Sequence, residues 1–164
     1  MSRLIATAFG IGHLPYAPGT WGSAAAIPAA YLIHALGGFP ALLIATLAVV
    51  LAGWWATAVA TKGHDDHDPS EIVIDEVAGQ WIALWPLSAG LWHAGADPWV
   101  FPWPGWVGAF VLFRLFDITK PGPIRWADRL HTPLGVMLDD VLAGLAAAVG
   151  VAVLAVLAHG IAGV

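Results

Sequence analysis

Two pairs of adjacent acids each come directly before an apolar stretch of the chain: Asp75 with Glu76, and Asp139 with Asp140. Adjacent helical residues point about 100° apart, so one member of a pair can face inward while the other braces the helix end. We expect both pairs near a helix N-terminus, where the helix dipole stabilises acids, and this effect by itself would explain one such pair. Four carboxylates at one depth repel one another unless a divalent cation lies among them, and all-oxygen ligands suit Mg²⁺. We therefore predict a Mg²⁺ site formed by these two pairs.

The segment FRLFDITKPGPIRWADR (residues 113–129) lies between the two pairs and carries cations. Arg114, Asp117 and Lys120 recur every three residues, so a helix would place them roughly on one face. An arginine in apolar surroundings is usually paired or functional, and a structural pair of Arg114 with Asp117 is the simplest explanation. Lys120 and Arg125 would then remain available to bind an anion, although Arg125 also fits a role as an anchor to lipid headgroups.

A glycine-rich segment, GIGHLPYAPGTWGSAAAIP (residues 10–28), precedes a stretch of small residues. Backbone N–H groups at the start of such a helix can bind a phosphate, with the hydroxyl groups of Thr20 and Ser23 nearby. Helix capping and close packing of small residues explain the same composition, and the segment alone favours that explanation. Its spacing differs from a Walker A loop, because Gly-Lys-Ser/Thr does not occur in it.

These residues belong to a chain that is too apolar for a water-soluble domain. Its 164 residues are 59% hydrophobic and only 10% charged, with a mean hydropathy of +0.78, whereas a soluble domain has about a quarter of its residues charged. Ten tryptophans suit the headgroup region of a bilayer. A net charge of −5 without a basic tract argues against nucleic-acid binding, and the absence of cysteine excludes disulfides and thiolate chemistry.

The apolar stretches predict an all-α fold, a polytopic membrane helical bundle. Crossing a hydrocarbon core of about 30 Å takes about 20 helical residues. Three stretches without acids, lysine or arginine are long enough, and two are shorter. We therefore expect four to five spans in a single domain, residues 1–164, with the first short stretch either a tilted span or half of a re-entrant N-terminal hairpin. The three long stretches are Phe39–Ala60, Val77–Ala96 and Val141–Val164, and the two short ones are Ala24–Leu36 and Pro98–Phe113.

Alternation of these spans places all the lysines and arginines on one side of the membrane. The positive-inside rule makes that side the cytoplasm. Ten of the eleven acids fall on the same side, and only Asp97 lies on the other. We therefore expect a multi-pass protein of the bacterial inner membrane with its polar chemistry on the cytoplasmic face. The cations concerned are Arg3, Lys62, Arg114, Lys120, Arg125 and Arg129.

Clustered carboxylates, cations and a glycine-rich segment together meet the requirements of phosphoryl chemistry. A metal ion polarises the phosphoryl oxygens and can activate water, while lysine and arginine balance the charge of the anion. Because the cluster is expected at the depth of the lipid headgroups, a phosphorylated lipid is a better candidate substrate than a soluble metabolite.

Four motifs carry a resemblance to a known family. GIGHLPYAPGTWGS, HDPSEIVIDEVAGQW, FRLFDITKPGPIRWADR and GVMLDDVLAG occur in order between Gly10 and Gly144, and the set resembles the phosphatidylglycerophosphatase A family. The resemblance implies a Mg²⁺-dependent inner-membrane enzyme that removes the terminal phosphate of phosphatidylglycerophosphate, a phospholipid, to give phosphatidylglycerol. It also implies motif roles for the acids Asp68, Asp75, Glu76, Asp117, Asp139 and Asp140 and for the cations Arg114, Lys120 and Arg125.

We hypothesise a role for each candidate residue. Direct attack by water is expected rather than a covalent intermediate through Asp117, because DITK lacks the D-x-D pattern of aspartyl-phosphate phosphatases. In this hypothesis Glu76, Asp139 and Asp140 bind Mg²⁺ with Asp75 as a further ligand or brace; Arg114, Lys120 and Arg125 bind the phosphate with Thr20 and Ser23, Asp117 orients one of these cations, and His67 with Asp68 supports the ligands from outside.

Two other functions remain open at this point. A lipid-linked phosphotransferase would share the depth and the metal, but its usual D-x-x-D-G-x-x-A-R signature is absent from the sequence. A small cation channel or transporter would use the acids as a selective vestibule. That interpretation requires acids along a path across the membrane, and the three long stretches contain none. The oligomeric state is not specified by the sequence.

Overall fold

The computed structural model describes residues 1–63 and 69–162, and helices dominate this part of the chain. No strand occurs among the described residues, which confirms the predicted all-α class. The elements in chain order are α1 (Ser2–Ala6), a 3₁₀ turn η1 (Ile11–His13), α2 (Pro18–Ala60), α3 (Ile74–Ala83), α4 (Trp85–His93), α5 (Trp103–Thr119), α6 (Pro123–Asp128) and α7 (Pro133–Ala162).

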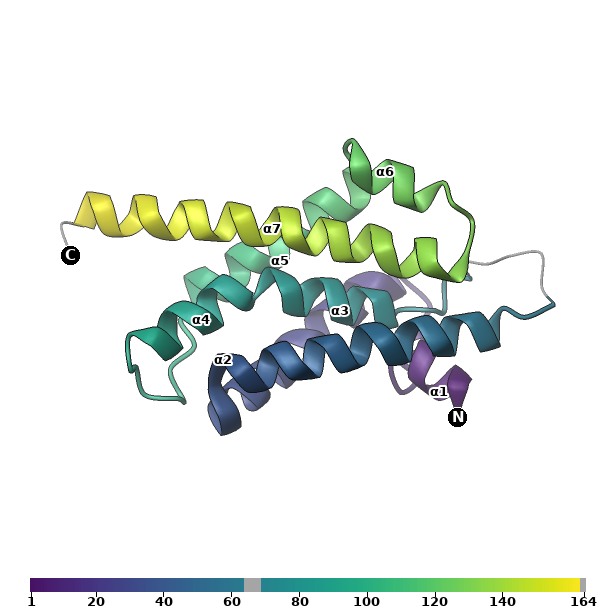
Figure 1. Ribbon diagram of the computed structural model, residues 1–164, viewed down its shortest axis with the longest axis horizontal. Coiled ribbons are helices and arrows are strands. Elements are labelled where there is room, and N and C mark those ends of the chain that lie inside the picture. Colours follow the sequence, from purple (N-terminus) through teal and green to yellow (C-terminus); the bar gives the residue numbers. More distant parts are fainter. Residues whose placement is uncertain (64–68, 163–164) are drawn as a thin grey trace.

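Helix α2 is a helical hairpin, because the chain reverses at Gly38 (Figure 1). Gly38 has φ 65° and ψ −161°, a conformation that glycine adopts without the penalty of a Cβ. A Cβ at this position would also collide with the indole of Trp92. The two halves, residues 18–37 and 39–60, are each about 30 Å long at 1.5 Å per residue. This reversal agrees with the predicted division between the stretches Ala24–Leu36 and Phe39–Ala60, and whether the first half is a tilted span or half of a re-entrant hairpin stays a prediction.

The predicted span Val77–Ala96 is divided between α3 and α4. The helix begins earlier, at Ile74, and breaks at Leu84. Pro86 lies in the first turn of α4 and has no N–H to continue the hydrogen-bond ladder of α3, which accounts for the interruption. Asp75 and Glu76 lie in the first turn of α3, as predicted.

Helices α5 and α7 also differ from the predicted boundaries. Helix α5 runs six residues past Phe113 to Thr119 and ends at Lys120, whose φ is 44°. Helix α7 begins at Pro133 rather than Val141, because Thr132 accepts a hydrogen bond from the Gly135 N–H and proline suits the first helical position. The prediction that the second acid pair lies at a helix N-terminus is therefore wrong: the pair lies about two turns inside α7.

Two helices, Pro18–Ala60 and Pro133–Ala158, are long and apolar enough to cross a membrane. Large apolar side chains on both helices are exposed, which a water-soluble protein avoids over such an area. The predicted count of four to five spans remains a prediction. The exposed apolar residues include Leu32, Leu36, Ile44, Leu47, Leu51, Val149, Val153, Leu154 and Val156.

Helix α3 packs closely against α7 at a pair of glycines. A Cβ at Gly79 would lie 2.7 Å from the backbone oxygen of Asp140, and a Cβ at Gly144 would lie 2.5 Å from the backbone oxygen of Gly79. Small residues let helix backbones approach where a hydrophobic driving force is weak. This close crossing fixes the distance between the two helices that carry the acid pairs.

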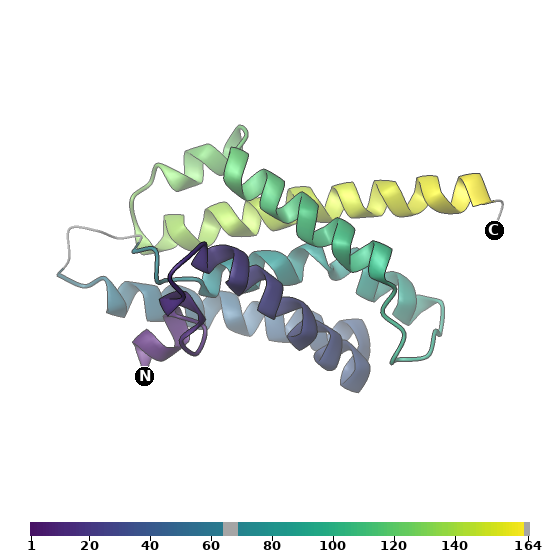
Figure 2. The same ribbon diagram turned by 180° about the vertical axis from the view of Figure 1, so that it is seen from behind.

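The polar segments meet at one end of the molecule (Figures 1 and 2). The first turns of α2, α3 and α7, the last turn of α5 and the whole of α6 lie at this end. The hairpin bend of α2, the connection between α4 and α5, and the C-terminal end of α7 lie at the other end. We refer to the first of these as the polar end.

Candidate active site

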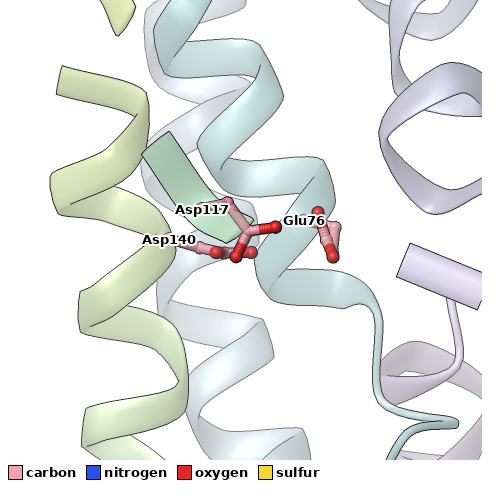
Figure 3. Close-up of side chains that lie close together, drawn as sticks. All are labelled: Glu76, Asp117 and Asp140. Carbon is pink, nitrogen blue, oxygen red and sulfur yellow. The ribbon is translucent and has the colours of Figure 1, made fainter. Parts of the chain in front are cut away.

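Three carboxylates from three helices converge at the polar end (Figure 3). Glu76 of α3, Asp117 of α5 and Asp140 of α7 each offer an oxygen, and these oxygens lie within 4.8 Å of one another. Asp140 is 3% exposed, and the side chains of Glu76 and Asp117 are 12% and 13% exposed. We call these three residues the carboxylate cluster; its all-oxygen donor set and spacing suit a hard divalent cation.

Arg114 joins two members of the carboxylate cluster. Its Nη1 lies 2.5 Å from Oε2 of Glu76 and 2.8 Å from Oδ2 of Asp117. The Ser23 hydroxyl also donates to Glu76 Oε2, at 2.7 Å. Burial, followed by repulsion from Asp117, raises the pKa of the Glu76 carboxyl, while Arg114 and Ser23 oppose that rise. One guanidinium therefore offsets only part of the cluster's negative charge.

Lys120 makes a second polar network beside the cluster. Its Nζ donates to Asp139 Oδ2 at 2.6 Å and to Asp128 Oδ1 at 2.5 Å. Burial lowers the pKa of the Lys120 ammonium, but the hydrogen bonds and charges of Asp128 and Asp139 outweigh burial and raise that pKa above its usual value. Lys120 therefore links Asp139 to Asp128 beside the carboxylate cluster.

The two acid pairs share one local arrangement. Oδ1 of Asp75 accepts the backbone N–H of Glu76 at 3.0 Å, and Oδ1 of Asp139 accepts the backbone N–H of Asp140 at 3.0 Å. In each pair the first acid braces the backbone and the second reaches the carboxylate cluster. The two acids of a pair therefore point in different directions, as the offset of about 100° between adjacent helical residues predicts.

A cavity of about 310 Å³ opens onto these groups. The first turn of α2 forms one wall, with Gly19 so close that a Cβ there would collide with Oε1 of Glu76. Small residues in this segment therefore serve close packing, and they also bring the positive end of the α2 dipole to the cavity. The cavity is lined by Ala17, Pro18, Gly19, Thr20, Ser70, Ile72, Asp75, Glu76, Arg114, Asp117, Lys120, Asp139 and Asp140.

Most of the predicted site residues face this one cavity. Ser23 does not line the cavity itself, but its hydroxyl donates a hydrogen bond to Glu76, which does. Arg125 does not line it, and its Nη2 donates instead to the Thr119 carbonyl at 3.4 Å. The proposed supporting pair His67 and Asp68 lies outside the described residues. The roles assigned to these residues remain predictions.

Sequence reasoning missed Asp128 and Gly19. Asp128 reaches Lys120 only because the turn at Pro121–Gly122 folds α6 back, and helical periodicity does not extend across such a turn. Gly19 belongs to the small-residue segment that we interpreted by packing or phosphate binding. The close contact with Glu76 could not be inferred without knowing that α2 and α3 are neighbours.

Fold and site together define an all-α protein with long apolar helices and a buried site of carboxylates and cations at one end. The family model described as Phosphatidylglycerophosphatase A matches residues 4–155. This chain belongs to the phosphatidylglycerophosphatase A family, which confirms the resemblance seen in the motifs. The predicted enzyme class, a phosphoric monoester hydrolase, is confirmed by the same finding.

Three curated relatives were compared with the chain. Phosphatidylglycerophosphatase A of Escherichia coli is 40% identical over 89% of this chain and 78% of its own length. A protein of Bacteroides thetaiotaomicron named "Putative phosphatidylinositol-3-phosphatase" is 40% identical over 87% of this chain and 86% of its own length. Phosphatidylglycerophosphatase A of Haemophilus influenzae is 38% identical over 90% of this chain and 84% of its own length. No solved structure matches the chain.

Proposed function

We propose that this protein is a Mg²⁺-dependent phosphatase that hydrolyses the terminal phosphate of phosphatidylglycerophosphate to give phosphatidylglycerol and phosphate. The observation that carries the proposal is the convergence of Glu76, Asp117 and Asp140 beside Arg114 and Lys120 in one cavity. Family membership supports the reaction, because two of the compared relatives are named for it. We further propose that the helices cross the bacterial inner membrane and that the polar end faces the cytoplasm.

The carboxylate cluster is the proposed Mg²⁺ site. Three carboxylates and one guanidinium leave a net negative charge among buried groups, which a divalent cation would compensate. The sequence hypothesis had Asp139 as the third Mg²⁺ ligand beside Glu76 and Asp140. We now propose Asp117 for that role, because Asp139 accepts a hydrogen bond from Lys120. When bound, Mg²⁺ would polarise the phosphoryl oxygens and favour ionisation of water.

Arg114, Lys120 and the start of α2 are the proposed phosphate ligands. The buried Nε of Arg114 has no hydrogen-bond partner within the described part of the chain, so it is a donor in need of an acceptor. Lys120 has three ammonium protons and directs two bonds to Asp128 and Asp139. The backbone N–H groups in the first turn of α2 add donors and a favourable dipole, with the Thr20 hydroxyl beside them.

Water, rather than Asp117, is the proposed nucleophile. Oδ2 of Asp117 is 2.8 Å from Arg114 Nη1, so this carboxylate is held by an ion pair and serves to orient the guanidinium. Attack by water on phosphorus breaks the bond between phosphorus and the glycerol oxygen. The products are inorganic phosphate and a lipid alcohol, with no acceptor other than water.

The decisive experiment is a phosphate-release assay on purified protein in detergent micelles. Phosphatidylglycerophosphate, phosphatidic acid and phosphatidylinositol 3-phosphate are compared at equal surface concentration, each with Mg²⁺ and with EDTA. We expect release of phosphate from phosphatidylglycerophosphate, loss of that release in EDTA, and recovery when Mg²⁺ is restored.

Other outcomes would contradict separate parts of the proposal. Full activity in EDTA would contradict the metal requirement. Faster release from either of the other lipids would contradict the substrate assignment. A requirement for an added alcohol acceptor, with no free phosphate formed, would favour a lipid phosphotransferase.

A further inference from the structure

A second cavity, of about 550 Å³, lies away from the polar groups on the flank of the helix bundle. One wall is the first half of α2, with Ala24, Ile27 and Tyr31, and the facing wall is α5, with Trp106 and Phe110. Figure 2 shows these two helices running side by side on the near face. We call this cavity the α2–α5 groove. Its walls are almost entirely apolar, so a polar ligand gains nothing there.

The α2–α5 groove lies next to the cavity that holds the carboxylate cluster. Helices α2 and α5 contribute to both cavities, and α3 and α7 also line the active-site cavity. Ala24 follows directly after Ser23, which binds Glu76. Phe110 lies one helical turn from Arg114, which lines the active-site cavity. The groove therefore begins about one turn from the proposed phosphate site and runs away from it.

Aromatic side chains line the far end of the groove. The Tyr31 hydroxyl donates to the backbone oxygen of Trp99 at 3.0 Å, which leaves the tyrosine ring as an apolar wall. The Tyr31 ring lies 5.5 Å from the ring of Phe101 and 6.1 Å from that of Trp99. From Ala24 to Tyr31 the groove extends about 10 Å along the α2 axis.

From this adjacency, length and apolar lining we propose that the α2–α5 groove binds an acyl chain of the phospholipid whose phosphate lies at the carboxylate cluster. The inference rests on the proposed function, and it adds a specificity: the enzyme recognises its substrate by chain length as well as by phosphate. A lipid with its phosphate at Arg114 can extend a chain directly between Ile27 and Phe110. Each methylene transferred from a micelle to closely packed walls gains contact with ordered side chains.

The test is a comparison of two chain lengths with a variant that fills the groove. Ile27→Trp adds bulk between the walls, and Ile44→Trp is the matched control. Ile44 lies on the second half of α2, is 68% exposed, and does not line the groove. Phosphate release is measured from phosphatidylglycerophosphate with dibutanoyl and with dioleoyl chains, in the same micelles with Mg²⁺.

We expect Ile27→Trp to raise KM for the dioleoyl substrate about tenfold, because the added indole displaces the acyl chain from its packing contacts with the groove walls. Its kinetics with the dibutanoyl substrate should stay within about twofold of wild type, which also shows that the variant is folded. Ile44→Trp should match wild type on both substrates. If Ile27→Trp cannot be obtained folded, Phe110→Ala removes one wall instead, and the same selective loss on the dioleoyl substrate is expected.

Four results would overturn the inference. No change on either substrate would show that the chain lies elsewhere. An equal loss on both would show that the variant disturbs the phosphate site rather than a chain site. An equal loss accompanied by a change in oligomeric state would identify the groove as a contact between copies of the chain. No phosphate release by wild type from either substrate would contradict the proposed function itself, and the chain site would fall with it.

Discussion

The two braced acid pairs decide which carboxylates can act at the site. Asp75 and Asp139 each accept a backbone N–H from the next residue, so their orientation is fixed by the helices they belong to. Glu76 and Asp140 are thereby directed toward Asp117. Carboxylates that are already held in place need little rearrangement when charge develops in the transition state, and this preorganisation favours catalysis.

Neutral replacements of the cluster acids should abolish catalysis without large changes in shape. We expect Glu76→Gln and Asp140→Asn each to lower kcat on the order of 10³-fold or more, because each removes one negative ligand of the proposed metal site. Phosphate release in detergent with excess Mg²⁺ measures the effect. Asp97→Asn, at an exposed acid far from the cluster, serves as the control and should retain wild-type turnover. Near-normal turnover in the two cluster variants would refute their assignment.

Metal binding should also be visible without turnover. A ligand that binds only the folded state raises its stability, so Mg²⁺ should increase the Tm of the wild-type protein in detergent. The same titration with Asp140→Asn should give a much smaller increase, and Ca²⁺ provides a comparison of ion size. An equal increase in both proteins would show that Mg²⁺ acts elsewhere.

At the scale of single residues, the sequence predicts which side chains belong to the candidate site but not which of them contact one another. Adjacent acids, Arg114 and Lys120 could be selected from residue type and spacing. Whether Asp139 or Asp140 enters the cluster depends on the rotational phase of α7 relative to α3 and α5, which is set by tertiary packing. Local periodicity contains no information about that phase, and so the contact between Lys120 and Asp139 emerged only from the structure.

At the scale of the elements, the crossing of α3 and α7 holds the active site together. Gly79 is three residues from Glu76, and its surroundings include the ring of Phe113 and the backbone of Asp140. Any separation of these helices would therefore move Glu76 away from Asp140. The geometry of the site therefore depends on a close backbone contact between two glycines, Gly79 and Gly144, which have no reactive side chain.

A methyl group at this crossing should be costly. Gly79→Ala would place its Cβ 2.7 Å from the Asp140 backbone oxygen, which cannot rotate away. We expect destabilisation of about 1–3 kcal/mol, a fall of several degrees in Tm, and a loss of activity. Gly108→Ala in α5 is the matched control, because nothing lies within 4 Å of its added Cβ. Equal stability of the two variants would show that the helices are not packed as closely as described.

Helix boundaries were harder to predict than helix existence. Hydropathy marks where a helix is apolar, whereas α5 and α7 extend beyond their apolar parts into segments that carry the charged residues. The capping interaction of Thr132 with Gly135 sets the true start of α7. The break at Leu84 follows from Pro86, a residue whose effect on an uninterrupted apolar stretch we did not anticipate.

At the scale of the whole molecule, charge is separated along the long axis. The carboxylate cluster, Arg114 and Lys120 lie at the polar end, and the opposite end contains the hairpin bend and the connection that carries Asp97. The positive-inside rule then gives the proposed orientation, with the polar end in the cytoplasm. The substrate's phosphate would be reached from the inner leaflet.

This orientation can be tested with single cysteines, because the native chain has none. Lys62 and Asp97 are both exposed and lie in connections at opposite ends. In intact spheroplasts, a membrane-impermeant maleimide should label Asp97→Cys and should label Lys62→Cys only after permeabilisation. The reverse pattern would invert the proposed topology, and labelling of both before permeabilisation would argue against a membrane-spanning arrangement.

The reversal at Gly38 has a consequence for how the chain reaches its final position. The turn between the two halves of α2 consists of Gly38 alone, with no charged group and no polar loop. In the proposed orientation, biogenesis of this pair of helices would carry no ionised side chain through the hydrocarbon. The transfer cost that normally calls for assisted translocation of a loop would therefore be almost absent from this part of the protein.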